Sequence, residues 1–471
     1  MKQIKFDIVF WLLLFIIFLI APILRIWIVF ISWTYVVAKS YKYIKSRFIL
    51  LAFSITFFTF LLGRIILPLF FSTPPNSHEN MDYFSANIWN FTYLALFLSL
   101  SGLYLGYSIG EQKWSTLLSP LHYGNNSRYY YYVRKFAKRL VYVSFVFKLM
   151  VTIEIIKFVF SNGYLALYLT PPHSMPYIVY KLADLFVLGT YVFLATMPCK
   201  KDSKFVLFLY IFDACVSIFT GRRGTFMFAV LLVVIYIYIR DVYSTNEKWL
   251  TPQIKRLGIL AIPFVLVGMF FIGFLRAEVE IDSYTSSNPI LSFFYSQGGS
   301  VQLIGLTKQS IDRLPPDQWY LLGPLLHIFD GTTIGQLFGR VEIEPQSPAM
   351  AMHGDSLGDY LTYQYNSVRY LNGGGYGSCY IAEAYADLGY FGIFLINYLF
   401  GWLMSRIRTW LFSNVWYSTF SFYVLFGILH APRGQAFSFL KEMLTPTVIL
   451  VMILIHLYAR EKSKFTQIRK E

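Results

Sequence analysis

Long apolar segments recur along the whole chain, and they restrict its fold more than any other feature. They lie near residues 8–23, 25–38, 48–71, 87–108, 139–160, 177–197, 205–219, 224–240, 257–275, 386–404, 412–429 and 437–458. A helix of about 20 apolar residues crosses the hydrocarbon core of a bilayer, where the backbone must satisfy its own hydrogen bonds. Charged residues make up only 14% of the chain. The sequence therefore predicts an all-α polytopic membrane protein with about twelve transmembrane helices.

Basic residues sort into alternate loops of this arrangement. Lys and Arg concentrate at both termini and in the loops 39–47, 111–139, 199–204, 240–256 and 405–411, whereas the loops 72–86 and 161–176 contain none. The positive-inside rule makes the basic set cytoplasmic, with both termini inside a bacterial inner membrane. A hairpin of the first two segments fits this sorting better than one long tilted helix, which would leave eleven spans. The net charge of +15 is therefore mostly a topology signal, and we expect no nucleic-acid partner.

One long polar connection, residues 276–385, interrupts the apolar pattern, and parity places it outside. Connections of this length are uncommon unless they are functional or disordered. This one contains Trp319, many tyrosines and helix-like stretches. We predict an ordered extracytoplasmic loop domain, between transmembrane helices 1–9 in residues 1–275 and helices 10–12 with a cytoplasmic tail in residues 386–471.

Several arginines lie at the predicted outer face, where the positive-inside rule disfavours them. Arg64 lies near the outer end of its span, Arg222 and Arg223 occupy a tight turn, Arg276 ends a span, and Arg433 lies in the last outer turn. Guanidinium groups bind phosphate bidentately, and the helix start after Arg223 also attracts anions. The alternative is that each arginine only reaches lipid headgroups. We favour a site for the diphosphate of a polyprenyl-linked sugar.

Ionisable residues inside the predicted spans keep a transporter open as an alternative. Lys181, Asp184 and Asp213 are costly in lipid, and they form either structural ion pairs or an ion path. The long outer loop and the lack of a strong internal repeat in the sequence disfavour a transporter.

The candidate catalytic groups gather in two stretches of the long loop. Glycosyl transfer from a lipid diphosphate needs a base for the acceptor hydroxyl and positive charge for the departing diphosphate. Glu383, Asp355 and His353 are the leading candidate bases, with Asp359 beside them. A metal held by His353, Asp355 and Asp359 is an alternative. Neither the cysteine and histidine spacing nor the glycine pattern matches a zinc or nucleotide site, so we expect no metal and no cofactor.

Four short motifs follow one another in the second half of the chain. They are Gly-Arg-Arg-Gly at 221–224, Tyr-Ser-Gln-Gly-Gly-Ser at 295–300, the stretch from His353 through Glu383 to Gly392, and Pro-Arg-Gly at 432–434. In their order they resemble the O-antigen polymerase (Wzy) family, over about residues 205–445. The first 200 residues match that family only in hydropathy. The second arginine of the first motif leaves open whether Arg222 or Arg223 is functional.

This resemblance implies a glycosyltransferase of lipopolysaccharide biosynthesis. A growing chain on undecaprenyl diphosphate would pass to the terminal hydroxyl of a new lipid-linked repeat unit at the periplasmic face. The substrate-binding residues would be Arg222, Arg223, Arg276, Arg433, Gln297, Asp359 and Tyr385. An O-antigen ligase, which passes the chain to lipid A–core, is the alternative within glycosyl transfer. A chain-length regulator protein is a further partner that we consider, and the sequence does not identify one.

Overall fold

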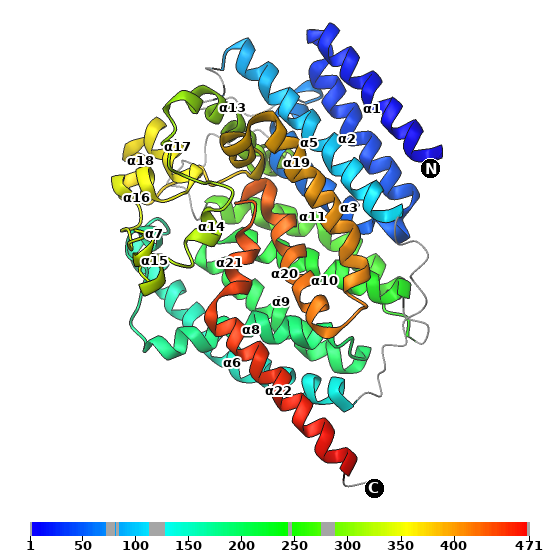
Figure 1. Cartoon of the computed structure of the whole chain (residues 1–471), viewed down its shortest axis with the longest axis vertical. Helices are drawn as coiled ribbons and strands as arrows, with labels where there is room; N and C mark the ends of the chain where they lie inside the picture. Colours follow the sequence, from blue (N-terminus) through cyan, green and yellow to red (C-terminus); the bar gives the residue numbers. More distant parts are fainter. Residues whose placement is uncertain are drawn as a thin grey trace. The chain divides into compact units, whose positions relative to one another are not determined.

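The computed structural model describes residues 2–71, 81, 84–112, 128–243, 247–274 and 288–468. Every regular element in these residues is a helix, as expected for a chain whose backbone must bond to itself in lipid (Figure 1). The α-helices are α1 (Lys2–Ile20), α2 (Arg25–Lys42), α3 (Ile44–Phe57), α4 (Gly63–Ile66), α5 (Ala86–Gln112), α6 (Arg128–Asn162), α7 (Ala166–Leu169), α8 (Tyr177–Ala195), α9 (Lys200–Ser217), α10 (Arg223–Tyr243), α11 (Pro252–Phe274), α12 (Pro289–Gln297), α13 (Val301–Ser310), α14 (Gly323–Leu326), α15 (Thr333–Leu337), α16 (Pro348–His353), α17 (Leu357–Tyr365), α18 (Ser367–Leu371), α19 (Tyr380–Trp410), α20 (Val415–His430), α21 (Ser438–Leu444) and α22 (Pro446–Ile468). The 3₁₀ turns are η1 (Pro22–Leu24), η3 (Leu67–Leu69), η4 (Ile218–Thr220), η6 (Gly298–Ser300), η7 (Ile311–Arg313) and η8 (Ala431–Arg433), and η2 (Phe58–Leu62) is a π-helical turn.

Within the described residues, seven helices are long and apolar enough to cross a membrane, or eight when the bent pair α21 and α22 counts as one span. All twelve expected segments lie largely in helices, but those near 8–23, 139–160 and 412–429 do not meet this criterion, and the segment near 257–275, in α11, is not tested by it. The apolar part of α1 is short, α20 has 16 residues, and α6 carries several charges. The protein is therefore an all-helical membrane protein with seven or eight candidate spans in the part of the chain that the structure describes, and the count of twelve is not confirmed.

The chain divides into two compact units, each assembled from distant segments. The first contains residues 1–115, 259–406 and 427–438, and the second contains residues 116–258, 407–426 and 439–471. Residues 288–379, with the short helices α12–α18, belong to the first unit together with the N-terminal helices. A separate loop domain over residues 276–385 is therefore not confirmed.

In the first unit, glycines bring α5 and α19 into backbone contact. A Cβ added at Gly106 would lie 2.0 Å from the carbonyl oxygen of Tyr398, and one added at Gly401 would lie 2.0 Å from that of Leu103. Gly102 is similarly pressed against α19. Small residues at a four-residue spacing allow transmembrane helices this close approach. This contact fixes the position of α19, whose first turn carries Glu383.

The second unit is built on the long helix α6, which packs along α8. Gly189 of α8 faces Val141 of α6, where an added Cβ would lie 3.2 Å from a side-chain carbon. The interior of this unit is aromatic, and the ring of Tyr191 lies 4.9 Å from that of Tyr423. A chain rich in phenylalanine and tyrosine fills its helix contacts with such ring pairs.

Candidate functional site

Three irregular helical turns of the first unit meet at residues 295–300, which we call the glycine turn. The π-helical turn η2 contacts both η6, which lies in the glycine turn, and η8. A Cβ added at Gly298 would lie 2.5 Å from the backbone nitrogen of Arg64, and one added at Gly63 would lie 2.9 Å from the carbonyl oxygen of Phe294. Only glycine allows these two backbones to touch. π-helical turns inside longer helices occur frequently at functional sites.

Two arginines reach the glycine turn from different helices. The Nε of Arg64 donates to the carbonyl oxygen of Tyr295 at 3.3 Å, and its guanidinium lies 5.2 Å from the centre of the Tyr295 ring. The Nη1 of Arg433 donates to Oε1 of Gln297. The Arg433 guanidinium also lies 5.5 Å from the centre of the Phe60 ring on η2. Both arginines are half-buried. Their contacts place two cations beside one short backbone segment.

A buried carboxylate ties the segment that carries Arg433 to the start of α19. Glu383 has no exposed surface. Its Oε1 accepts a hydrogen bond from the Ser378 hydroxyl at 2.5 Å, and its Oε2 accepts one from the backbone N–H of Ala436 at 2.9 Å. Ala436 follows Arg433 by three residues. Glu383 therefore fixes the path of the chain just beyond Arg433.

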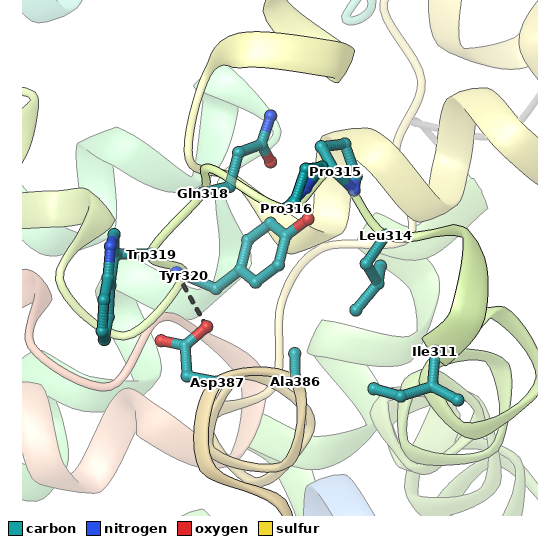
Figure 2. A pocket seen from close by; sticks show the side chains of 9 residues that line it. All are labelled: Ile311, Leu314, Pro315, Pro316, Gln318, Trp319, Tyr320, Ala386 and Asp387. Atoms are coloured by element: carbon teal, nitrogen blue, oxygen red, sulfur yellow. Dashed lines mark hydrogen bonds between the residues drawn. The ribbon is translucent and has the colours of Figure 1, made fainter.

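Two further carboxylates hold three successive backbone N–H groups. Asp355 accepts from Trp319 at 3.0 Å, and Asp387 accepts from Tyr320 at 3.1 Å and from Leu321 at 2.8 Å. Figure 2 shows Asp387 on α19 directly below the backbone of Tyr320. Hydrogen bonds to charged acceptors are stronger than those to neutral ones, so Tyr320 and Leu321 are held against α19 and Trp319 against the loop before α17.

Asp355 is also the end of a chain of polar contacts that includes two ion pairs of Arg340. Its Oδ2 lies 2.9 Å from Nη1 of Arg340, the Nε of Arg340 lies 2.7 Å from Asp330, and Asp330 lies 2.6 Å from Nδ1 of His327. Burial acts to raise the pKa of Asp330, but its bonds to Arg340 and His327 hold that pKa below its ordinary value. Burial acts to lower the pKa of Arg340, but the carboxylates of Asp330 and Asp355 raise it above its ordinary value. Both oxygens of Asp355 are thus engaged in binding other parts of the protein.

The other predicted residues of the first unit lie apart from these bonds. His353 is exposed at the end of α16, and Asp359 is half-buried in the first turn of α17, where burial raises its pKa. The Tyr385 hydroxyl accepts from Nζ of Lys308 at 3.0 Å, and this bond is the main cause that raises the pKa of Lys308. In the part of the chain that the structure describes, no group of three His, Cys, Asp or Glu side chains is placed to hold a metal ion.

Arg222 and Arg223 belong to the second unit. They follow Gly221, whose φ of +81° is left-handed and whose added Cβ would lie 2.4 Å from the Tyr164 ring. Arg222 is exposed, and the half-buried Arg223 begins α10, so a tight turn before a helix is present as predicted. Arg276 lies outside the described residues.

The family model described as O-antigen polysaccharide polymerase Wzy matches residues 4–464. The chain belongs to this family. The match extends the predicted resemblance, which covered about residues 205–445, to nearly the whole chain. The chain has no significant match among curated proteins or among solved structures. Membership makes this chain a multi-pass membrane protein for O-antigen polymerisation, with a glycosyltransferase-type activity on lipid-linked oligosaccharide.

In this Wzy-family chain, the structure adds residues to the predicted site. The sequence marked Arg64 only as one of the outward arginines, and it did not link Arg64 to the glycine turn. Its contact with Tyr295 joins residues 231 positions apart, which no local pattern reveals. Ser378 lies in the glycine-rich stretch before Glu383. Its position five residues before the acid was the only sequence signal for the hydrogen bond between them.

Proposed function

We propose that this chain lengthens O-antigen, or a similar surface polysaccharide, by joining undecaprenyl-diphosphate-linked repeat units at the outer face of the inner membrane. The convergence of Arg64 and Arg433 on the glycine turn, in a member of the Wzy family, is the observation that carries this proposal. The sorting of basic loops supports cytoplasmic termini and a periplasmic site.

In the proposed reaction, the terminal hydroxyl oxygen of an incoming repeat unit attacks the anomeric carbon of the growing chain. The new C–O bond forms while the bond from that carbon to the diphosphate oxygen breaks. The bonding electrons leave with undecaprenyl diphosphate, and a base takes the hydroxyl proton. The sugar–diphosphate bond supplies the energy, so no nucleotide is required.

Arg64 and Arg433 stabilise the departing diphosphate in this proposal. Preorganised positive charge aimed at a developing anion is usually the largest contribution to such catalysis. Gln297 orients Arg433, and the ring of Tyr295 faces Arg64. The binding roles of Arg222, Arg223, Arg276, Asp359 and Tyr385 stay predictions for the rest of the substrate.

Glu383 takes a positioning role rather than that of a base. A base must come within hydrogen-bond reach of the acceptor hydroxyl, whereas both oxygens of the fully buried Glu383 already accept protein hydrogen bonds. Asp355 is engaged in the same way. Of the three predicted bases, His353 is the exposed one, and we propose it as the proton acceptor.

The proposal is tested with purified protein and a lipid-linked repeat unit, by following the ladder of longer products. We expect Arg433→Ala to lower turnover by roughly 10- to 150-fold, because hydrogen bonds to charged groups contribute about 1.5–3 kcal/mol. Arg433→Lys keeps the charge but not the bidentate fork, so its turnover should fall between those of the wild type and Arg433→Ala. Arg369→Ala, on the short helix α18, is the matched control for the loss of an arginine. Failure of the wild-type protein to extend a competent substrate would contradict the function itself.

A further inference from the structure

A hollow in the first unit lies over the first turns of α19 and is not used by the proposed leaving-group site. It has a volume of about 260 Å³ and lies between residues 311–320 and the side chain of Asp387. Figure 2 shows Leu314 and Ile311 across from the ring of Tyr320, with Asp387 below it and Trp319 at the outer edge, beyond the backbone of Tyr320. Pockets for drug-sized ligands measure about 300–1,000 Å³, so this hollow suits a single small ring.

The lining is mainly polar and includes two aromatic residues, Trp319 and Tyr320. Trp319 is 54% exposed, so its indole is accessible to a ligand. Asp387 uses one hydrogen bond on each carboxylate oxygen, and each oxygen can accept another. The hydroxyl of Tyr320 is buried and, among the residues that the structure describes, has no hydrogen-bond partner. A ligand for this hollow therefore offers both an apolar face and hydroxyl donors.

The hollow is rigid, because its wall is fixed to two carboxylates. The backbone N–H groups of Trp319, Tyr320 and Leu321 are all bound by Asp355 or Asp387. Binding surfaces that are already ordered lose less conformational entropy when a ligand arrives. The three bonds therefore fix the backbone that carries the side chains of Trp319 and Tyr320.

We propose that this hollow binds one sugar ring of the repeat-unit oligosaccharide. A pyranose ring has an apolar C–H face that packs on an indole and edge hydroxyls that donate to a carboxylate. A hydrocarbon ligand would leave Asp387 without added bonds, and an anion would be repelled by it. Asp387 follows Glu383 by four residues on α19, so the two carboxylates share one helix face. The inference rests on the proposed function, since it places a sugar of the same substrate near the Arg433 segment that Glu383 holds.

The test uses the full chain in detergent and the repeat-unit oligosaccharide released from its lipid carrier. Binding is followed by saturation-transfer NMR, and KM and kcat are measured with the lipid-linked form. We expect Trp319→Ala to weaken oligosaccharide binding and to raise KM by roughly 2- to 12-fold, with kcat little changed, as for loss of an aromatic contact. Trp319→Phe should recover most of the affinity. Phe338→Ala removes an aromatic side chain that is 80% exposed elsewhere in the unit, and it should match the wild type.

The outcomes separate this inference from the proposed function. If the protein extends its substrate but Trp319→Ala behaves like Phe338→Ala in both assays, the sugar site is wrong and the polymerase proposal stands. If the oligosaccharide binds in a Trp319-dependent way but no longer product forms, the sugar site stands and the polymerase proposal is wrong.

Discussion

Replacing Glu383 separates a positioning role from that of a proton acceptor. Glu383→Ala removes the oxygen that accepts the hydrogen bond from the Ala436 N–H at 2.9 Å. Ala436 and Glu383 both have no exposed surface, so the N–H would be left buried. A buried donor left without a partner costs about 1–3 kcal/mol. If that cost is relieved by a shift of the segment after Arg433, the productive arrangement loses roughly 5- to 150-fold in population.

Glu383→Gln is the matched control, because its amide oxygen can still accept from Ala436 and its NH₂ can donate to the Ser378 hydroxyl. We therefore expect Glu383→Gln to retain most of the turnover, whereas Glu383→Ala loses it together with affinity for the lipid-linked substrate. The assay is kcat and KM for chain extension, with thermal unfolding in detergent as a control for folding. If Glu383→Gln folds but loses turnover as completely as Glu383→Ala, the positioning role is refuted and Glu383 acts as a base.

Three further changes test neighbouring features of the first unit. Gly298→Ala should abolish or strongly lower activity, because its Cβ would lie 2.5 Å from the backbone nitrogen of Arg64, and chain-extension rates check this. Asp330→Asn should lower the unfolding temperature near neutral pH. Since the pKa of Asp330 is depressed in the folded state, its stabilising effect is present above the ordinary aspartate pKa of about 4 and is lost as the pH falls, so melting curves of mutant and wild type should converge in acid. His353→Ala should lower kcat by roughly 100-fold or more with KM little changed, as for loss of a general base, and steady-state kinetics would expose an unaffected kcat.

Hydropathy and charge alone were enough to predict the helical class and the membrane location. Both follow from local properties, since each apolar segment satisfies its backbone within itself. Hydropathy did not predict the number of spans, because the charges within α6 and the short lengths of α1 and α20 weaken the hydropathy signal of those segments. The family motifs also lie in short segments, so they were visible without the fold.

The predicted residues themselves were chosen by type, and type does not say what a side chain touches. Asp355 and Glu383 were candidate bases as carboxylates near glycines, yet each binds one backbone N–H group from a distant segment. The contact of Arg433 with Gln297 spans 136 positions. Such pairs depend on which helices can approach, and here glycines such as Gly106 decide that by shape.

The sequence by itself determined that this chain is helical, lies in a membrane, and carries arginines and acids near its polar connections. Only the tertiary structure decided that Arg64 and Arg433 share the glycine turn and that Trp319 lies beside a hollow over α19. The physical reason is that hydropathy acts within one segment, whereas a site forms where segments far apart in the chain pack closely enough for their polar groups to bond.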